Sequence, residues 1–163
     1  MVKVAVMGYG TIGSGVVEIL EKNAARIKKT SGEDLEVKYV LDLREFEGDP
    51  IQSKIVHDYQ IIANDPEIRV VVETMGGVEP AYTFVKAMLE AGKHVTTSNK
   101  ALVADKGAEL IALAAEKNVN FLFEASVGGG IPIIRPLVQC LTADVIEEVS
   151  GILNGTTNYM LTR

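Results

Sequence analysis

Short apolar runs alternate with longer segments of helical periodicity along this chain. Runs that predict strands lie at 2–7, 35–43, 68–75, 119–125 and 145–153, and another strand begins at His94 and ends in a polar loop reaching Lys100. Apolar residues three or four positions apart predict helices at 11–29, 79–94, 101–118 and 131–141, with a short helix at 60–65. The stretch at 44–58 is polar, and its pattern is ambiguous between helix, strand and loop.

This order of elements predicts the fold class. Nearly continuous apolar strands separated by helices are typical of a mainly parallel sheet with helices on both faces, which is a Rossmann-like, doubly wound α/β fold. Ligands of such sheets bind outside the carboxyl ends of the strands. Four polar or glycine-rich segments follow strands, beginning at Gly8, Thr74, Thr96 and Glu124. We expect them to lie together on one rim of the sheet.

A glycine-rich loop joins the first strand to the first helix. Its residues fit the pattern GxGxxG and are Gly8, Tyr9, Gly10, Thr11, Ile12 and Gly13. The first glycine permits a tight turn, the second admits a pyrophosphate, and the third allows the helix to pack closely on the strand. The free N–H groups of the helix N-terminus favour an anion. The loop predicts dinucleotide binding, and the alternative is that its glycines serve only the turn.

The choice between NAD and NADP depends on the end of the second strand. Asp42 lies where an acidic residue binds both ribose hydroxyls of NAD, and this favours NAD by a small margin. Arg44 lies two residues further and is placed to meet the 2′-phosphate of NADP, unless it is only a solvated surface charge. Both cofactors stay open.

Two further rim loops carry candidate residues. Glycines after Thr74 allow a ribose or nicotinamide to lie against the backbone, although the same residues suit an ordinary turn. Thr96, Thr97 and Ser98 are able to bond the nicotinamide carboxamide; the alternative is that Ser98 or Asn99 caps the next helix. Lys100 follows them and is able to stabilise a substrate oxygen. At Glu124, a carboxylate before a glycine-rich loop suits a hard cation, but the residues alone favour a carboxylate that accepts backbone N–H bonds.

Composition excludes several other classes of function. Of the 163 residues 47% are apolar, enough for a buried core, and the net charge of −6 gives no support for a nucleic-acid partner. No apolar run approaches the ~18 residues of a membrane span. The single cysteine, Cys140, is expected to be a packed thiol, and a cytoplasmic location is expected. Neither His57 nor His94 has zinc-ligand spacing.

Five motifs together give the chain a family resemblance. In order they are GYGTIGSGV at 8–16, VVETMGG at 71–77, HVTTSNKALVA at 94–104, FEASVGGGIPIIRPL at 123–137 and GILNGTTNYML at 151–161. The glycine loop alone is a weak signal, whereas the last three are specific. Together they resemble homoserine dehydrogenase over almost the whole chain. The resemblance implies reduction of L-aspartate 4-semialdehyde to L-homoserine with NADH or NADPH, on the route to threonine and methionine.

The resemblance also implies roles for individual residues. Lys100 would lie near the nicotinamide and the substrate. Glu124, with the carbonyls of Val127, Gly129 and Ile131, would form a monovalent-cation site, usually for sodium, which replaces the residue-level interpretation of Glu124. Residues 8–13 would hold the pyrophosphate. The other implied cofactor contacts are Thr74, Gly76, Ser98, Asn99, Gly155 and Thr156.

The resemblance predicts two parts of unequal size. Residues 1–142 would form the dinucleotide-binding domain, and 143–163 would begin a truncated substrate and dimerisation domain. We therefore expect this chain to bind cofactor with little activity, and the intact enzyme to be a homodimer or larger. The alternative of another class is a free-standing NAD(P)-binding module that senses redox state or binds a partner without catalysis.

Overall fold

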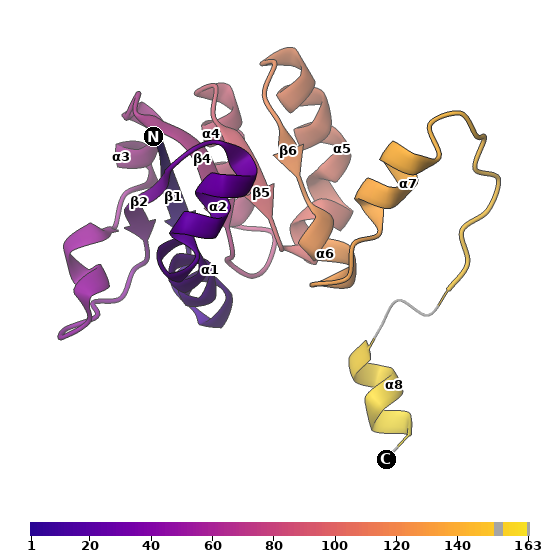
Figure 1. Ribbon diagram of the computed structural model, residues 1–163, viewed down its shortest axis with the longest axis horizontal. Coiled ribbons are helices and arrows are strands. Elements are labelled where there is room, and N and C mark those ends of the chain that lie inside the picture. Colours follow the sequence, from indigo (N-terminus) through magenta and orange to yellow (C-terminus); the bar gives the residue numbers. More distant parts are fainter. Residues whose placement is uncertain (152–154, 163) are drawn as a thin grey trace.

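The computed structural model describes residues 1–151 and 155–162, and the side chains of 155–157 lie outside this description. Its centre is a parallel sheet of six strands in the order β3-β2-β1-β4-β5-β6 (Figure 1). The strands are β1 (Val2–Met7), β2 (Leu35–Leu41), β3 (Ile55–Val56), β4 (Ile68–Glu73), β5 (His94–Thr97) and β6 (Phe121–Leu122). The predicted doubly wound α/β fold is therefore confirmed.

Helices connect the strands and continue beyond them. They are α1 (Thr11–Lys22), α2 (Ala24–Ser31), the 3₁₀ helix η1 (Pro50–Lys54), α3 (Tyr59–Asn64), α4 (Ala81–Glu90), α5 (Lys100–Glu116), α6 (Glu124–Gly128), α7 (Ile134–Cys140) and α8 (Gly155–Leu161). Within the described chain, no helix is both long and apolar enough to cross a lipid bilayer.

The sheet buries a different apolar cluster on each face, because successive strand residues point to opposite sides. Ala5 and Met7 pack with α3, α4 and α5, whose contributions include Met88 and Leu110. Val6 belongs to the opposite cluster, to which α1 and η1 contribute. In Figure 1, α1 and α2 accordingly lie across the sheet from α4 and α5. This two-sided burial explains why the strands are almost continuously apolar in sequence.

Three sequence-based expectations need correction. The helix predicted at 11–29 is interrupted at Asn23, whose backbone leaves helical geometry (φ −103°, ψ 14°), as suits a residue with low helix propensity. The stretch at 44–58, which the sequence left ambiguous, contains η1 and the short strand β3. The last predicted strand is wrong over 145–151, which has no paired partner and leaves Val145 88% exposed. Cys140 is exposed instead of packed.

The sheet order places β1 between the two halves of the fold. β2 pairs with one side of β1 and β4 with the other. The chain therefore adds strands first on one side of β1 and then on the other, so the strand order reverses beside β1. A crevice at the carboxyl ends of these strands is the usual ligand site of an open α/β sheet. The loops after β1, β2, β4 and β5 all reach this rim.

Candidate functional site

The glycine loop after β1 is held in a conformation that only glycine suits. Gly8 has φ +97° and donates its N–H to the Leu41 carbonyl at 2.8 Å. A Cβ added at Gly13 would lie 1.9 Å from the Gly8 carbonyl oxygen, so the loop and α1 pack without space for a side chain. A Cβ at Gly10 would meet no atom within 4 Å. Gly13 therefore serves packing, whereas Gly10 leaves open space above the loop.

The first turn of α1 is suited to an anion. Its N-cap residue is Gly10, which brings no side-chain cap to the helix N-terminus. The first N–H groups of a helix have no partner within the helix and carry partial positive charge. Ile12, in the same turn, is 55% exposed. A helix N-terminus of this kind, exposed and without a side-chain cap, is able to accept an anion.

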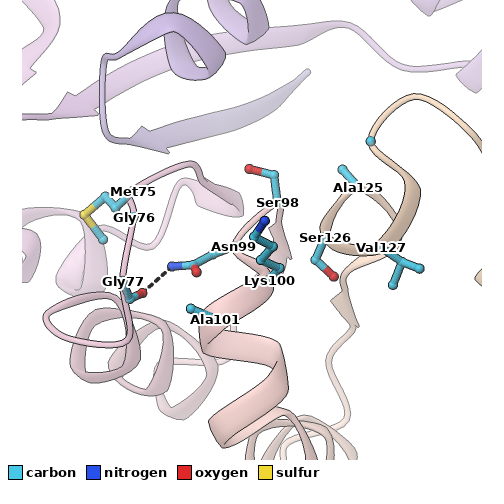
Figure 2. A pocket seen from close by; sticks show the side chains of 11 residues that line it. Met75, Gly76, Gly77, Ser98, Asn99, Lys100, Ala101, Ala125, Ser126 and Val127 are labelled. Atoms are coloured by element: carbon cyan, nitrogen blue, oxygen red, sulfur yellow. Dashed lines mark hydrogen bonds between the residues drawn. The ribbon is translucent and has the colours of Figure 1, made fainter. Parts of the chain in front are cut away.

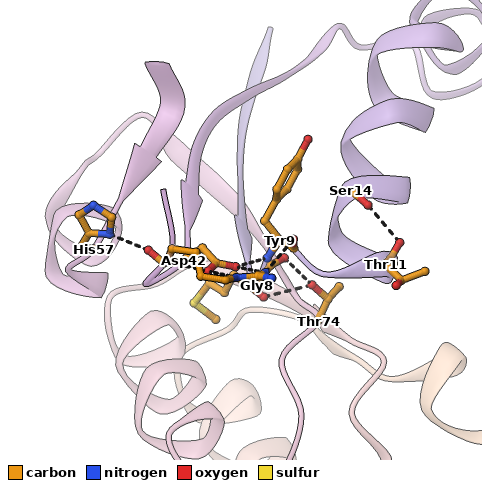
Figure 3. A network of polar contacts seen from close by, with 9 residues as sticks. Gly8, Tyr9, Thr11, Ser14, Asp42, His57 and Thr74 are labelled. Atoms are coloured by element: carbon orange, nitrogen blue, oxygen red, sulfur yellow. Dashed lines mark hydrogen bonds and ion pairs between the residues drawn. The ribbon is translucent and has the colours of Figure 1, made fainter. Parts of the chain in front are cut away.

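Thr74 holds the loop from the side of β4. Its hydroxyl lies 2.9 Å from the Gly8 carbonyl and 3.2 Å from the Met7 carbonyl, and its N–H donates to Met7 at 2.9 Å. In Figure 3, Asp42 and Thr74 approach the loop from opposite sides. Thr74 thus supports the glycine loop, a role that sequence reasoning does not anticipate.

Asp42 and Arg44 form an ion pair beside the loop. The Asp42 carboxylate accepts the Tyr9 N–H at 2.8 Å, and the Arg44 guanidinium binds both carboxylate oxygens at 2.9 Å. The Arg44 side-chain hydrogen bonds are the main cause that holds the pKa of Asp42 far below its usual range. Arg44 also donates to the Tyr9 carbonyl at 3.0 Å and lies over the ring of Phe46. The two predicted ribose-reading residues are therefore bonded to each other.

A cleft of about 420 Å³ opens beside this pair. Asp42, Arg44 and His57 contribute its polar part, and its apolar lining consists of Leu41, Leu43, Met75, Pro80 and Phe84, with Gly8 at the loop. The His57 ring nitrogens lie 2.7 Å from the Asp42 carbonyl and 2.9 Å from a Glu45 carboxylate oxygen. These two acceptors raise the pKa of His57. The cleft therefore combines an apolar slot with a polar edge beside the glycine loop.

A second cleft, also of about 420 Å³, lies at the ends of β4 and β5. Figure 2 shows Ser98 and the exposed Lys100 on one side of it and Ser126 on the other. The full lining is Met75, Gly76, Gly77, Ser98, Asn99, Lys100, Ala101, Ala125, Ser126, Val127 and Gly129. Met75 lines both clefts, so they adjoin along the rim.

Asn99 is occupied by the protein itself. Its side-chain oxygen accepts the Leu102 N–H at 3.1 Å and caps α5, and its amide group donates to the Gly77 carbonyl at 2.6 Å. Asn99 is 6% exposed. The structure therefore gives Asn99 the capping role that the sequence left as an alternative, and leaves Ser98 and Lys100 as the accessible polar side chains of this segment.

Glu73 is a buried carboxylate that sequence reasoning missed. It has no exposed surface, lies at the end of β4, accepts the Met75 N–H at 2.7 Å and bonds the Thr97 hydroxyl. Burial raises the pKa of Glu73, against the opposing effect of these hydrogen bonds. The carboxylate ties together the loops after β4 and β5. An acidic residue placed directly after the apolar residues 70–72 is the signal that could have identified it.

Glu124 is the first residue of α6, in the segment predicted as the end of a strand. One of its oxygens accepts the N–H groups of Ile133 and Ile134, the latter at 2.8 Å, and the other accepts the Arg135 N–H at 2.8 Å. These backbone hydrogen bonds lower the pKa of Glu124. The carboxylate thus caps the start of α7. Val127, Gly129 and Ile131 follow it on the same segment, whereas the side-chain surroundings of Gly155 and Thr156 lie outside the described residues.

Comparison with known proteins identifies the family. Residues 8–124 match the family model for the NAD-binding domain of homoserine dehydrogenase, and residues 132–163 match the homoserine dehydrogenase model. The homoserine dehydrogenases of Lactococcus lactis and Synechocystis are 38% and 42% identical over 99% of this chain. The chain spans 39% and 38% of their respective lengths.

Solved structures agree with this result. The crystal structure of a homoserine dehydrogenase from Thiobacillus denitrificans has a TM-score of 0.90 and 40% identity over 98% of this chain and 38% of that chain. A homoserine dehydrogenase from Staphylococcus aureus has a TM-score of 0.71 and 36% identity over 78% of this chain. With the glycine loop and the paired clefts, these matches show that the chain belongs to the homoserine dehydrogenase family of oxidoreductases and contains its NAD-binding domain.

Proposed function

We propose that this chain holds NAD(H) or NADP(H) along the rim of the sheet, for the interconversion of L-aspartate 4-semialdehyde and L-homoserine. The observation that supports this most directly is the pair of adjoining clefts, which share Met75 and one of which is lined by Gly8 of the glycine loop. A dinucleotide has two ends joined by a pyrophosphate. The loop after β1 would hold the pyrophosphate, the cleft beside Asp42 the adenosine, and the cleft beside Lys100 the nicotinamide.

The bound nicotinamide would supply or accept the hydride, and the residues of the chain would position the reactants. Gly76 and Gly77 expose backbone where the ring is expected, and Ser98 offers a hydroxyl to its carboxamide. Lys100 lies exposed at the start of α5, in the same cleft. Its ammonium would hold the aldehyde oxygen and stabilise the negative charge that develops there as hydride is transferred. Orientation of the reactants would be the main contribution of this cleft.

We expect a monovalent cation, usually sodium in this family, at the oxygen atoms around Glu124. One oxygen of this carboxylate already accepts two N–H groups, whereas the other accepts only that of Arg135 and keeps a lone pair. Carbonyl oxygens of Val127, Gly129 and Ile131 would complete a set of hard ligands of the kind such cations prefer. The cation would order the segment between β6 and α7, next to the Lys100 cleft.

The matched relatives are more than twice as long as this chain. We expect parts of those proteins outside the matched region to complete the substrate site and to form the contacts of a dimer or larger oligomer. The chain alone should therefore bind cofactor and show little turnover. The substrates and the biosynthetic route to threonine and methionine follow from the family membership, and a cytoplasmic location is expected for an enzyme of this route.

Calorimetric titration of the purified chain with NAD and NADP tests the proposal. Binding of at least one of them, with loss of at least about tenfold in affinity on Gly10→Ala, is expected, because a methyl group at this position occupies the space through which a pyrophosphate approaches. Gly15→Ala is the matched control, since a Cβ there also meets no atom within 4 Å but lies further along α1. Failure of both cofactors to bind at millimolar concentration would refute the proposed function.

A further inference from the structure

The hydrogen-bonding capacity of Asp42 is full. An ionised carboxylate offers about four lone-pair positions. One oxygen of Asp42 accepts the backbone N–H of Arg44 at 3.0 Å and its Nε–H at 2.9 Å. The other accepts the Tyr9 N–H at 2.8 Å and the Arg44 Nη2–H at 2.9 Å. Ribose hydroxyls, which an acid in this place binds in NAD-specific sites, would have to displace one of these donors.

Arg44, in contrast, keeps donors available. Its Nε and Nη2 atoms bind Asp42, and Nη2 also donates to the Tyr9 carbonyl at 3.0 Å. Among the hydrogen bonds of the described residues, none uses Nη1, which carries two N–H groups. The side chain is 61% exposed and forms part of the wall of the adenosine-side cleft. The ion pair with Asp42 and the contact with Phe46, 5.0 Å from the ring centre, fix the direction of this free edge.

The nearest acidic competitor for Arg44 is held elsewhere. Glu45 follows Arg44 directly, but its carboxylate bonds the His57 ring at 2.9 Å and the side-chain amide of Gln52. The two His57 ring nitrogens lie against two acceptors, the Asp42 carbonyl and the Glu45 carboxylate. Only a protonated imidazole carries an N–H group on both nitrogens and donates both hydrogen bonds. Asp42 and Glu45 thus each have a partner, and the Nη1 group of Arg44 remains available to an external anion.

We propose that the adenosine-side cleft recognises a ribose 2′-phosphate, so that this chain prefers NADP(H) to NAD(H), with Arg44 as the specificity-determining residue and Asp42 as the residue that positions it. A guanidinium binds phosphate through charge-assisted N–H bonds, and among the described contacts the two N–H groups of Nη1 remain available to donate them. This inference rests on the proposed function, because it concerns the adenosine end of the same cofactor site.

Calorimetric titrations with four probes test the inference: NADP⁺, NAD⁺, adenosine 2′,5′-bisphosphate and ADP. The last two report on the adenosine end without the nicotinamide. We expect the two probes with a 2′-phosphate to bind roughly 10- to 100-fold more tightly than their counterparts, the range expected for a charge-assisted hydrogen-bonded contact. Arg44→Leu should abolish that difference and leave the affinity for NAD⁺ unchanged or higher, because Asp42 is then free to accept ribose hydroxyls.

Matched variants separate recognition from folding. Arg26→Leu makes the same change at an exposed arginine of α2, away from the rim, and should leave all four affinities unchanged. Arg44→Lys keeps the positive charge but loses the planar guanidinium donors, and it should retain part of the preference for probes with a 2′-phosphate. Asp42→Asn should reduce the ratio of NADP⁺ to NAD⁺ affinity, whereas a purely structural role would lower both affinities equally.

The outcomes distinguish this inference from the function on which it rests. If NAD⁺ binds as tightly as NADP⁺, or if Arg44→Leu behaves as Arg26→Leu does, the inference is wrong and cofactor binding stands. If none of the four probes binds, the inference and the proposed function are both overturned.

Discussion

The carboxylate of Glu73 shows how one residue organises the rim. It is fully buried between the loops after β4 and β5, where it accepts from Met75 and Thr97. Buried acceptors of this kind are costly to remove, because the donors that faced them lose a partner that water cannot replace. At this scale the site depends on pairs of groups that satisfy each other: Glu73 with Thr97, Asp42 with Arg44, and His57 with Glu45.

Replacement of Glu73 tests this dependence. Glu73→Leu should destabilise the chain by about 1–3 kcal/mol, because it leaves the Met75 N–H and the Thr97 hydroxyl without their acceptor. Glu73→Gln keeps an oxygen for Met75 and should be tolerated far better. Because burial raises the pKa of Glu73, the wild type loses stability as pH rises above its unfolded value of about 4.3, so the glutamine variant should gain relative to it from pH 4 to pH 7. Urea unfolding at both pH values measures this, and equal behaviour of the two variants would contradict it.

His57 predicts a pH dependence of the same sign in a higher pH range. The Asp42 carbonyl and Glu45 raise its pKa, so its protonated form stabilises the fold at pH values below about 6.5, its unfolded value. That contribution is lost as pH rises through the folded pKa. The difference in thermal midpoint between wild type and His57→Gln should therefore be largest near pH 5.5 and shrink toward pH 9. NMR titration of the ring is the direct check, and a pKa at or below 6.5 would sink the prediction.

At the scale of elements, the turn from β1 to α1 combines two different requirements for glycine. Gly13→Ala places a methyl group against the Gly8 carbonyl and should destabilise the fold by about 1–3 kcal/mol, the usual cost of overpacking. Gly10→Ala meets open space and should leave the thermal midpoint almost unchanged while it weakens cofactor binding. Differential scanning calorimetry compares the two, and a larger loss of stability in Gly10→Ala would contradict this assignment.

The segment from α6 to α7 depends on Glu124. Its carboxylate accepts three consecutive N–H groups at the start of α7, and a glutamine there keeps only one oxygen for them. Glu124→Gln should loosen this segment, seen as faster amide exchange at Ile134 and Arg135, and should remove any effect of sodium on cofactor affinity. Glu116→Gln, on the exposed end of α5, is the control. An unchanged response to sodium, measured against choline chloride, would contradict the cation proposal.

The apolar pattern predicts most elements, because burial on both faces of the sheet leaves a strong signal in β1, β4 and α4. It fails where tertiary contacts decide. β3 has two residues and exists only because it pairs with β2, and 145–151 is apolar enough for a strand but has no partner. The glycine loop and the position of Lys100 on the rim follow from strand ends alone. The saturation of Asp42 by Arg44 does not, since it depends on how side chains two residues apart share their hydrogen bonds.

At the scale of the whole molecule, the two clefts and the glycine loop form one continuous rim above the parallel sheet. Met75 lies between the clefts and lines both, and Glu73 next to it secures the loops on the Lys100 side. β1 carries the loop at the centre, between β2 and β4. Under the proposed function a single extended ligand would occupy this rim, with one end beside Arg44 and the other beside Lys100.

The central claim is that the two clefts are one dinucleotide site, and amide chemical-shift mapping of the chain during titration with NADP⁺ tests it most directly. We expect residues of the glycine loop, of the Asp42–Arg44 cleft and of the Ser98–Ala101 segment to shift together and to saturate at one common concentration. Shifts confined to one cleft, or two clefts that saturate at different concentrations, would contradict the account.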